Sequence, residues 1–155
     1  MRNRWMQSFG RLLAAGAPLW YEVEEMSIPP LRRILFVEDD PDIQVVASLA
    51  LESVGGLSVL VCGSGPEALS RFPEFRPDLV LLDVMMPGMD GPTMLAALRR
   101  LPDGAATPVV FLTARVQRYE IARYRELGAA DVIAKPFDPM TLADTVQSIW
   151  RSLHA

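Results

Sequence analysis

Thiol and imidazole groups, which often build reactive sites, are scarce in this sequence. It contains one cysteine, Cys62, and one histidine, His154. A single cysteine cannot form an internal disulfide, which is typical of a protein from a reducing cytosol, so we expect a cytoplasmic chain. A histidine next to the last residue is better interpreted as a solvated terminal residue than as a metal ligand or a phosphoryl donor.

The chain also lacks an excess of basic charge and a long apolar run. Its formal net charge is −4 and its pI is about 5.0, so its composition gives no reason to expect nucleic acid as a partner. No apolar stretch approaches the roughly 20 residues that a membrane-spanning helix needs, and we expect no membrane contact. Arg11 interrupts the apolar stretch from Phe9 to Trp20, which argues against a signal peptide.

Lysine is almost absent, because Lys135 stands alone against fourteen arginines. In a chain that uses arginine wherever it needs a cation, the lone lysine is a candidate for a site that requires a compact ammonium group rather than a planar guanidinium. Chance explains a single lysine equally well. This observation therefore needs support from other residues.

The remaining composition is that of one globular domain. Half of the 155 residues are hydrophobic and 22% are charged, which is enough for a core but too little chain for two domains of ordinary size. We divide the sequence into an N-terminal extension, residues 1–30, and a domain, residues 31–155. The extension is expected to be flexible or to reflect the choice of start codon, because Met26 would also be a sensible start.

From Arg33 onward, short apolar segments alternate with segments of helical periodicity. The apolar segments are continuous, which indicates strands that are buried on both faces of a sheet. Capping residues mark the helix starts, as Asp40 and Pro41 do for the first helix. Pro73 is expected to end the second helix near Phe72. The predicted strands are 34–37, 57–62, 79–82, 109–112 and 132–134, and the predicted helices start near 41, 65, 92, 117 and 139.

Five strands alternating with five helices predict a doubly wound α/β fold. Strands that are buried on both faces need helices on both sides of the sheet, and this arrangement requires parallel strands with right-handed crossovers. For a chain of this size we expect the flavodoxin-like strand order 2-1-3-4-5. In such sheets, ligands bind beyond the carboxyl ends of the strands, where the strand order reverses.

Polar side chains end four of the five predicted strands. Asp39 follows the first strand, Asp83 the third, Thr113 the fourth and Lys135 the fifth. If the first and third strands are neighbours, Glu38, Asp39 and Asp83 lie close together. Each residue alone is more commonly a helix cap, a turn residue or a loop residue. The combination indicates a site, because every member ends an apolar strand.

Crowded carboxylates repel one another and need a counter-charge. A hard divalent cation with oxygen ligands, Mg²⁺ in particular, meets that need and also takes phosphate oxygens. An aspartate in this place can act as a nucleophile toward phosphorus, while the metal and Lys135 neutralise charge on the transferring group. The residues therefore predict phosphoryl transfer to Asp83, with the Thr113 hydroxyl at the same edge.

Four segments resemble the receiver domain of two-component response regulators, and the resemblance extends over residues 31–153. Residues 34–41 (ILFVEDDP) resemble the first strand and acidic pair, and residues 82–91 (LDVMMPGMDG) resemble the phosphoacceptor loop. Residues 111–114 (FLTA) resemble the threonine motif, and residues 135–137 (KPF) the lysine motif, whose Lys–Pro bond is typically cis. Each motif is weak alone, but four in this order at the family's spacing are specific.

The resemblance implies a role for each of these residues. Asp83 would be the phosphoacceptor, Thr113 would hydrogen-bond the phosphoryl group, and Lys135 would pair with a phosphoryl oxygen. A sensor histidine kinase or a histidine phosphotransfer protein would be the donor, and the domain would be no enzyme beyond catalysing its own phosphorylation and dephosphorylation. The Mg²⁺ ligands would be the acidic pair, the phosphoacceptor and one backbone carbonyl, namely Glu38, Asp39, Asp83 and Met85.

The sequence shows no output motif, so we expect a single-domain response regulator that is a monomer or a weak dimer. It would signal through a downstream protein target or through a phosphorelay. Val132 occupies the place of the family's switch aromatic, so an aromatic flip at that position cannot be the readout. Met85 lies two residues after the phosphoacceptor, where a polar side chain can help to orient the hydrolytic water. Slow loss of the phosphoryl group is therefore expected.

Three other classes of protein share parts of this pattern. A phosphatase of the haloacid dehalogenase type needs a second aspartate two residues after the nucleophile, where this chain has Met85. A flavodoxin-like cofactor binder needs a phosphate-cradling loop after the first strand, where the acidic residues would instead repel phosphate. A phosphorylation-independent interaction module is the main alternative, but such modules usually lack a site residue, and this chain has all of them.

Overall fold

The computed structural model describes residues 27–155, so the predictions made for residues 1–26 lie outside the described residues. Residues Leu31–Leu153 form one compact unit around a parallel sheet with the strand order β2-β1-β3-β4-β5. This topology confirms the predicted doubly wound α/β fold. The strands are β1 (Arg33–Val37), β2 (Ser58–Cys62), β3 (Leu79–Asp83), β4 (Val109–Thr113) and β5 (Asp131–Ala134).

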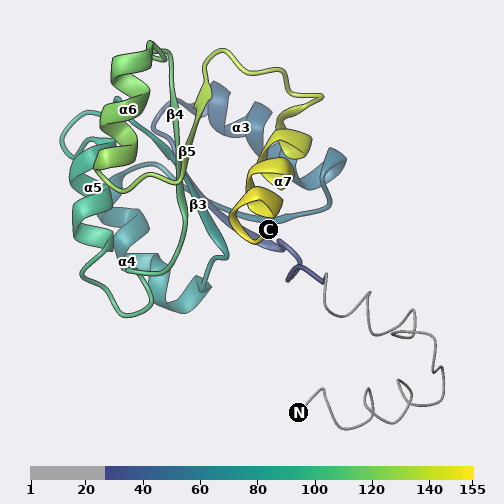
Figure 1. Ribbon diagram of the computed structural model, residues 1–155, viewed down its shortest axis with the longest axis horizontal. Coiled ribbons are helices and arrows are strands. Elements are labelled where there is room, and N and C mark those ends of the chain that lie inside the picture. Colours follow the sequence, from purple (N-terminus) through teal and green to yellow (C-terminus); the bar gives the residue numbers. More distant parts are fainter. Residues whose placement is uncertain (1–26) are drawn as a thin grey trace, which may run out of the picture. The chain divides into compact units, whose positions relative to one another are not determined.

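Helices cover both faces of the sheet, as Figure 1 shows. One face is covered by α3 and α7, and the other by α4, α5 and α6. A π-helical turn, η1, continues directly from α3. The bounds are α3 (Pro41–Leu49), η1 (Ala50–Val54), α4 (Gly65–Phe75), α5 (Gly91–Leu98), α6 (Arg118–Glu126) and α7 (Leu142–Leu153).

Apolar packing on both faces explains why the strands read as continuous hydrophobic runs. Successive side chains of a strand point to opposite faces of the sheet, and every residue of β3 and β4 is buried. The core beneath α4, α5 and α6 includes Leu35, Val80, Leu82 and Phe111. The alternate strand residues are fully buried on the other face, among them Ile34, Phe36, Leu79 and Leu81.

The first helix starts where its capping residues predict. The Asp40 side chain accepts hydrogen bonds from the N–H groups of Asp42 and Ile43, at 2.8 and 3.3 Å. The helical region then runs through α3 and η1 to Val54, and Gly55 follows. A Cβ atom added at Gly55 would lie 2.7 Å from the Cβ of Ala143, so this glycine allows η1 and α7 to pack closely.

The expected end of the second helix at Phe72 is wrong. Pro73 lies inside α4, which continues to Phe75 and ends at Arg76 in the left-handed conformation, with a φ of 55°. Proline removes one backbone donor, but its fixed φ is compatible with a helix. The N–H of Arg76 still donates to the carbonyl of Phe72 at 3.0 Å, so the final turn closes around the proline.

Cys62, at the end of β2, provides a test of this packing. Its side chain is fully buried, and burial raises the pKa of the thiol to about 11. The thiolate is the reactive form, so little of it exists at mildly alkaline pH in the folded protein. We expect Ellman's reagent at about pH 8 to label the native protein slowly and the guanidinium-unfolded protein within the mixing time. Equally fast labelling of both states would contradict this burial.

Candidate functional site

The carboxyl ends of β1 and β3 bring the acidic residues together. These strands are neighbours in register, with Val37 beside Leu82. Carboxylate oxygens of Glu38, Asp39 and Asp83 all lie within 4.8 Å of one another. Glu38 and Asp83 are buried, with exposed fractions of 1% and 2%, whereas Asp39 is exposed. The cluster therefore opens to solvent on the Asp39 side.

Glu38 is held on three sides although its carboxylate is buried. Its N–H donates to the carbonyl of Cys62 on β2 at 3.0 Å, and its Oε2 accepts from the N–H of Asp40 at 3.1 Å. Its Oε1 lies 2.9 Å from the Nζ of Lys135, as an ion pair without an aligned hydrogen bond. Burial raises the pKa of Glu38 more than these contacts lower it, and the nearby Asp83 charge raises it further.

Lys135, at the end of β5, supplies the counter-charge to both buried carboxylates. Its Nζ also donates to Asp83 Oδ1 at 3.1 Å. Burial alone would lower the pKa of Lys135, but the hydrogen bonds and negative charges of Glu38 and Asp83 outweigh it and raise the pKa. The ammonium therefore stays protonated at neutral pH. The lone lysine of the chain lies where a compact cation can contact two carboxylates at once.

Thr113 lies at the end of β4, between β3 and β5 in the sheet, and is buried. Its Oγ1 accepts a hydrogen bond from the N–H of Arg115 at 3.1 Å, and its carbonyl accepts from the N–H of Lys135 at 2.9 Å. The peptide bond from Lys135 to Pro136 is cis, as the resemblance implies. The backbone thus links the hydroxyl-bearing residue directly to the lysine.

The loop after β3 folds back over Asp83. The N–H of Gly91, the first residue of α5, donates to the carbonyl of Val84 at 2.9 Å. A Cβ atom at Gly91 would lie 2.9 Å from the carbonyl oxygen of Asp83, so a larger residue would push α5 away from the site. Met85 donates its N–H to Asp83 Oδ1 at 3.3 Å, and its side chain is exposed. The role of the Met85 carbonyl as a metal ligand stays a prediction.

The donor set fits a small divalent cation. All three acidic residues offer oxygen, the atom that Mg²⁺ prefers. Glu38 Oε1 is buried and accepts no aligned hydrogen bond in the described part of the chain, so it retains a lone pair for another cation. Glu38, Asp39 and Asp83 are therefore the residues that can hold the metal, and the exposure of Asp39 leaves room for water and phosphate oxygens.

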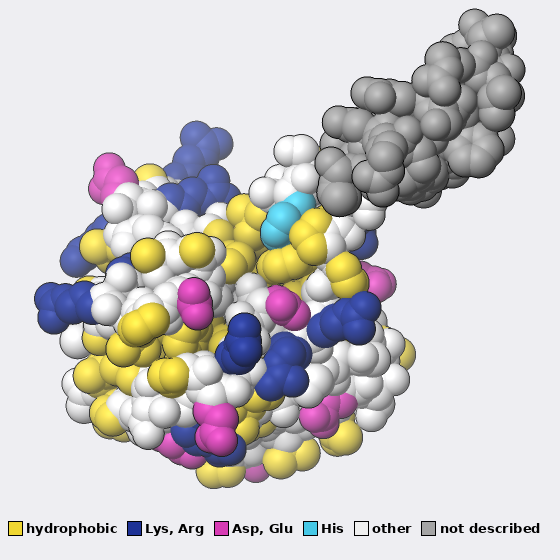
Figure 2. Space-filling view, turned by 90° about the horizontal axis from the view of Figure 1, so that it is seen from below, with side chains coloured by type: hydrophobic (Ala, Val, Ile, Leu, Met, Phe, Trp, Pro, Cys, Tyr) yellow, Lys and Arg dark blue, Asp and Glu magenta, His cyan; other side chains and the backbone are white. Residues whose placement is uncertain are grey.

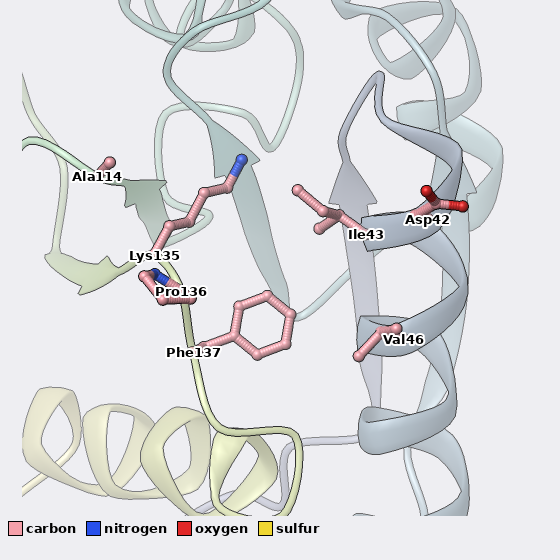
Figure 3. A pocket seen from close by; sticks show the side chains of 7 residues that line it. All are labelled: Asp42, Ile43, Val46, Ala114, Lys135, Pro136 and Phe137. Atoms are coloured by element: carbon pink, nitrogen blue, oxygen red, sulfur yellow. The ribbon is translucent and has the colours of Figure 1, made fainter.

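An apolar cavity of about 370 Å³ borders Lys135, and sequence patterns did not indicate it. In Figure 3, Ile43 and Val46 of α3 face Phe137 across the cavity, and the Lys135 side chain extends from beside Pro136 toward the end of β3. Ile43 is half-buried and Val46 is 42% exposed, so this wall of the cavity is open to solvent.

The aromatic side chain beside β4 comes from a helix rather than from β5. Val132 pairs with Phe111 across β4 and β5 and is half-buried. Tyr124 of α6 is buried and meets the Phe111 ring edge to face, with centroids 5.3 Å apart and an interplanar angle of 86°. An aromatic residue therefore contacts the strand that carries Thr113, although the β5 position holds valine.

The fold and this geometry define a class of protein, and comparison with known proteins identifies it. A family model, the response regulator receiver domain, matches residues 34–147. The chain therefore belongs to the response regulator receiver domain family, a signalling module of two-component systems. Among solved structures, the chemotaxis protein CheY4 of Vibrio cholerae is 30% identical, with a TM-score of 0.72, over 77% of this chain and 99% of that one.

Curated relatives are longer than this chain. The transcriptional regulatory protein CseB of Streptomyces coelicolor is 39% identical over 118 residues, which are 76% of this chain and 49% of that protein. The DNA-binding response regulator MtrA of Mycolicibacterium smegmatis is 38% identical over 117 residues, which are 76% of this chain and 50% of that protein. The chain thus spans about half the length of the curated relatives that it matches.

These relatives correct one expectation from composition. The exclusion of nucleic acid as a partner is wrong, because relatives that match over the receiver domain are named as DNA-binding regulators. The net charge of a receiver domain does not report contacts made elsewhere in such a protein. In Figure 2 the visible face intersperses cationic and acidic side chains.

None of the helices in residues 27–155 has the length and hydrophobicity to span a bilayer.

The raised pKa of Glu38 predicts an effect on stability. A raised pKa means that the folded state binds this proton more readily than the unfolded state, so the ionised form costs stability at neutral pH. We expect Glu38→Gln to raise the melting temperature in EDTA at neutral pH. The difference should shrink as the pH falls below the pKa of an unfolded glutamate, where wild-type Glu38 is protonated in both states. A lower melting temperature for the variant at neutral pH would contradict the direction of this pKa shift.

Proposed function

We propose that this chain is a cytoplasmic receiver domain that accepts a phosphoryl group on Asp83 from a histidine kinase or a histidine phosphotransfer protein. The observation that carries the proposal is the contact of one ammonium, that of Lys135, with both Glu38 and Asp83. Asp39 lies in the same cluster and faces solvent. A phosphoryl acceptor requires a carboxylate nucleophile, positive charge beside it and access from solvent, and this cluster has all three.

The hydrogen bonds of Asp83 assign different roles to its two oxygens. Oδ1 accepts from Lys135 Nζ and from the N–H of Met85. Oδ2 is therefore the oxygen that is left to attack phosphorus. As the new bond forms, the bond between phosphorus and the donor atom breaks; this atom is a histidine nitrogen of the kinase or an oxygen of acetyl phosphate. Lys135 then neutralises charge that develops on the phosphoryl oxygens. The Thr113 oxygen accepts from the N–H of Arg115, so its O–H is available to donate to one of the phosphoryl oxygens.

Mg²⁺ would be held by Glu38, Asp39, Asp83 and the carbonyl of Met85, with Asp39 as the direct ligand of the acidic pair. When bound, the ion supplies positive charge to the phosphoryl oxygens. Carboxylate oxygens of Glu38, Asp39 and Asp83 lie within 4.8 Å of one another, and this crowding supports the assignment. Asp40 would have a secondary role, because its side chain caps α3.

Phosphorylation would be read by another protein surface or passed on in a phosphorelay. The names of the relatives make a DNA-binding segment one such protein contact. A phosphorylation at Asp83 would reach α6 through Thr113, since the N–H of Arg115 bonds Thr113 and the Arg115 guanidinium lies 3.8 Å from Glu120 in the first turn of α6. This path starts at the hydroxyl and does not require an aromatic side chain on β5.

Intact-protein mass spectrometry tests the acceptor directly. Incubation with acetyl phosphate and Mg²⁺ should add one phosphoryl group to the wild type, and the adduct should be absent with EDTA and in Asp83→Asn. Asp144→Asn, an exposed aspartate of α7, is the matched control and should keep the adduct. If the wild type takes no phosphoryl group and does not bind beryllofluoride, the protein is instead a phosphorylation-independent interaction module.

Met85 predicts a long-lived phosphorylated state. Its thioether side chain is 62% exposed beside Asp83 and cannot orient a water molecule as an amide can. We expect Met85→Asn to speed the loss of the phosphoryl group by roughly tenfold, the effect of ~1.4 kcal/mol on the barrier. Met140→Asn changes another exposed methionine, near α7, and should leave the rate unchanged. Fast loss from the wild type that Met85→Asn does not alter would refute this explanation.

A further inference from the structure

Gln44 contacts the acidic loop from the second turn of α3. Its Nε2 donates a hydrogen bond to the main-chain carbonyl of Glu38 at 2.5 Å. Its own N–H donates to the carbonyl of Asp40 at 2.9 Å. The amide lies close to the loop after β2, because a Cβ atom added at Gly63 would be 3.6 Å from Nε2, and the Gln44 side chain is half-buried. The side chain therefore lies between the acidic loop and the loop after β2 and is bonded to the acidic loop.

The bonded carbonyl belongs to the peptide unit that leads from Glu38 to Asp39. A peptide unit is planar, so fixing this carbonyl also fixes the direction in which the chain enters Asp39. In the described part of the chain, the Asp39 carboxylate has no hydrogen-bond or ion-pair partner of its own. It nevertheless lies near two like charges, which repel it toward solvent. Asp39 thus depends on its backbone for its place in the cluster.

The other contacts of the loop hold atoms around this peptide unit, and the carbonyl itself is held by Gln44. The N–H of Glu38 is held by Cys62 on β2, and its carboxylate is held by Asp40 and Lys135. Rotation about the ψ angle of Glu38 would leave the bond to Cys62 intact, but it would break the bond from the Asp40 N–H and the bond from the Gln44 amide while it turned Asp39 away. The bond from Gln44 opposes that rotation.

We propose that Gln44 is a positioning residue, which holds the Glu38–Asp39 peptide so that the Asp39 carboxylate faces Glu38 and Asp83 and thereby sets the affinity for Mg²⁺. This inference rests on the proposed function, because it concerns the same metal-binding cluster. Gln44 does not touch the metal or the phosphoryl group. Its loss should therefore change the Mg²⁺ concentration that the reaction requires and not the rate once the site is saturated.

The test replaces Gln44 by methionine, which has similar length but no N–H donor. Isothermal titration with Mg²⁺ should show affinity weakened by roughly three- to tenfold in Gln44→Met, the range expected for one lost hydrogen bond. The Mg²⁺ concentration for half-maximal phosphorylation by acetyl phosphate should rise by the same factor. The rate at saturating Mg²⁺ should stay within about twofold of wild type, since transition-state contacts are unchanged.

Gln147→Met on α7 makes the same chemical change away from the acidic cluster and should match wild type in every assay. Equal Mg²⁺ affinity of Gln44→Met and wild type would overturn the inference while leaving the proposed function intact. A fall in the rate at saturating Mg²⁺ with unchanged affinity would also overturn it. A wild type that takes no phosphoryl group at all would overturn the proposed function and this inference together.

Discussion

One ammonium group balances the two buried carboxylates around which this site is built. Lys135 Nζ lies 2.9 Å from Glu38 and 3.1 Å from Asp83, and its pKa is raised by both. Without this charge, ionised Glu38 and Asp83 would be buried side by side and would repel each other with no cation to balance them. The same contacts leave Asp39, and one oxygen of Asp83, as the parts of the cluster that meet incoming groups.

The fold makes this balance possible because three strands end at the same edge of one sheet. β1 and β3 are adjacent and bring the acids together, while β5 lies two places further along and reaches back with the long lysine side chain. The hydrogen bond from Lys135 N–H to the Thr113 carbonyl ties β5 to β4 at this edge. Gly91 then lets α5 begin close against Asp83, so the loop after β3 stays near the site.

Local chemistry explains why some expectations from sequence hold and others fail. Asp40 and Pro41 mark a helix start, and the structure has one there, since a cap depends on a few neighbouring residues. Pro73 was expected to end the helix near Phe72, but α4 continues to Phe75, whose side chain packs against the core. The expectation that nucleic acid is not a partner was wrong for another reason. The charge composition describes this domain and not the longer relatives that share it.

The sequence by itself determined the order of strands and helices, the fold class and the residues that end the strands. These features follow from local periodicity, capping and the geometry of parallel sheets. Only the tertiary structure decided that Lys135 pairs with Glu38 as well as Asp83, that Phe111 meets Tyr124 of α6, and that Gln44 bonds the Glu38 carbonyl. Such contacts depend on the directions of side chains and on the distances between segments. Some of these segments are far apart in the chain, and others lie on either side of a loop. No periodic pattern encodes them, and Gln44 reads in the sequence as an ordinary polar residue on a helix.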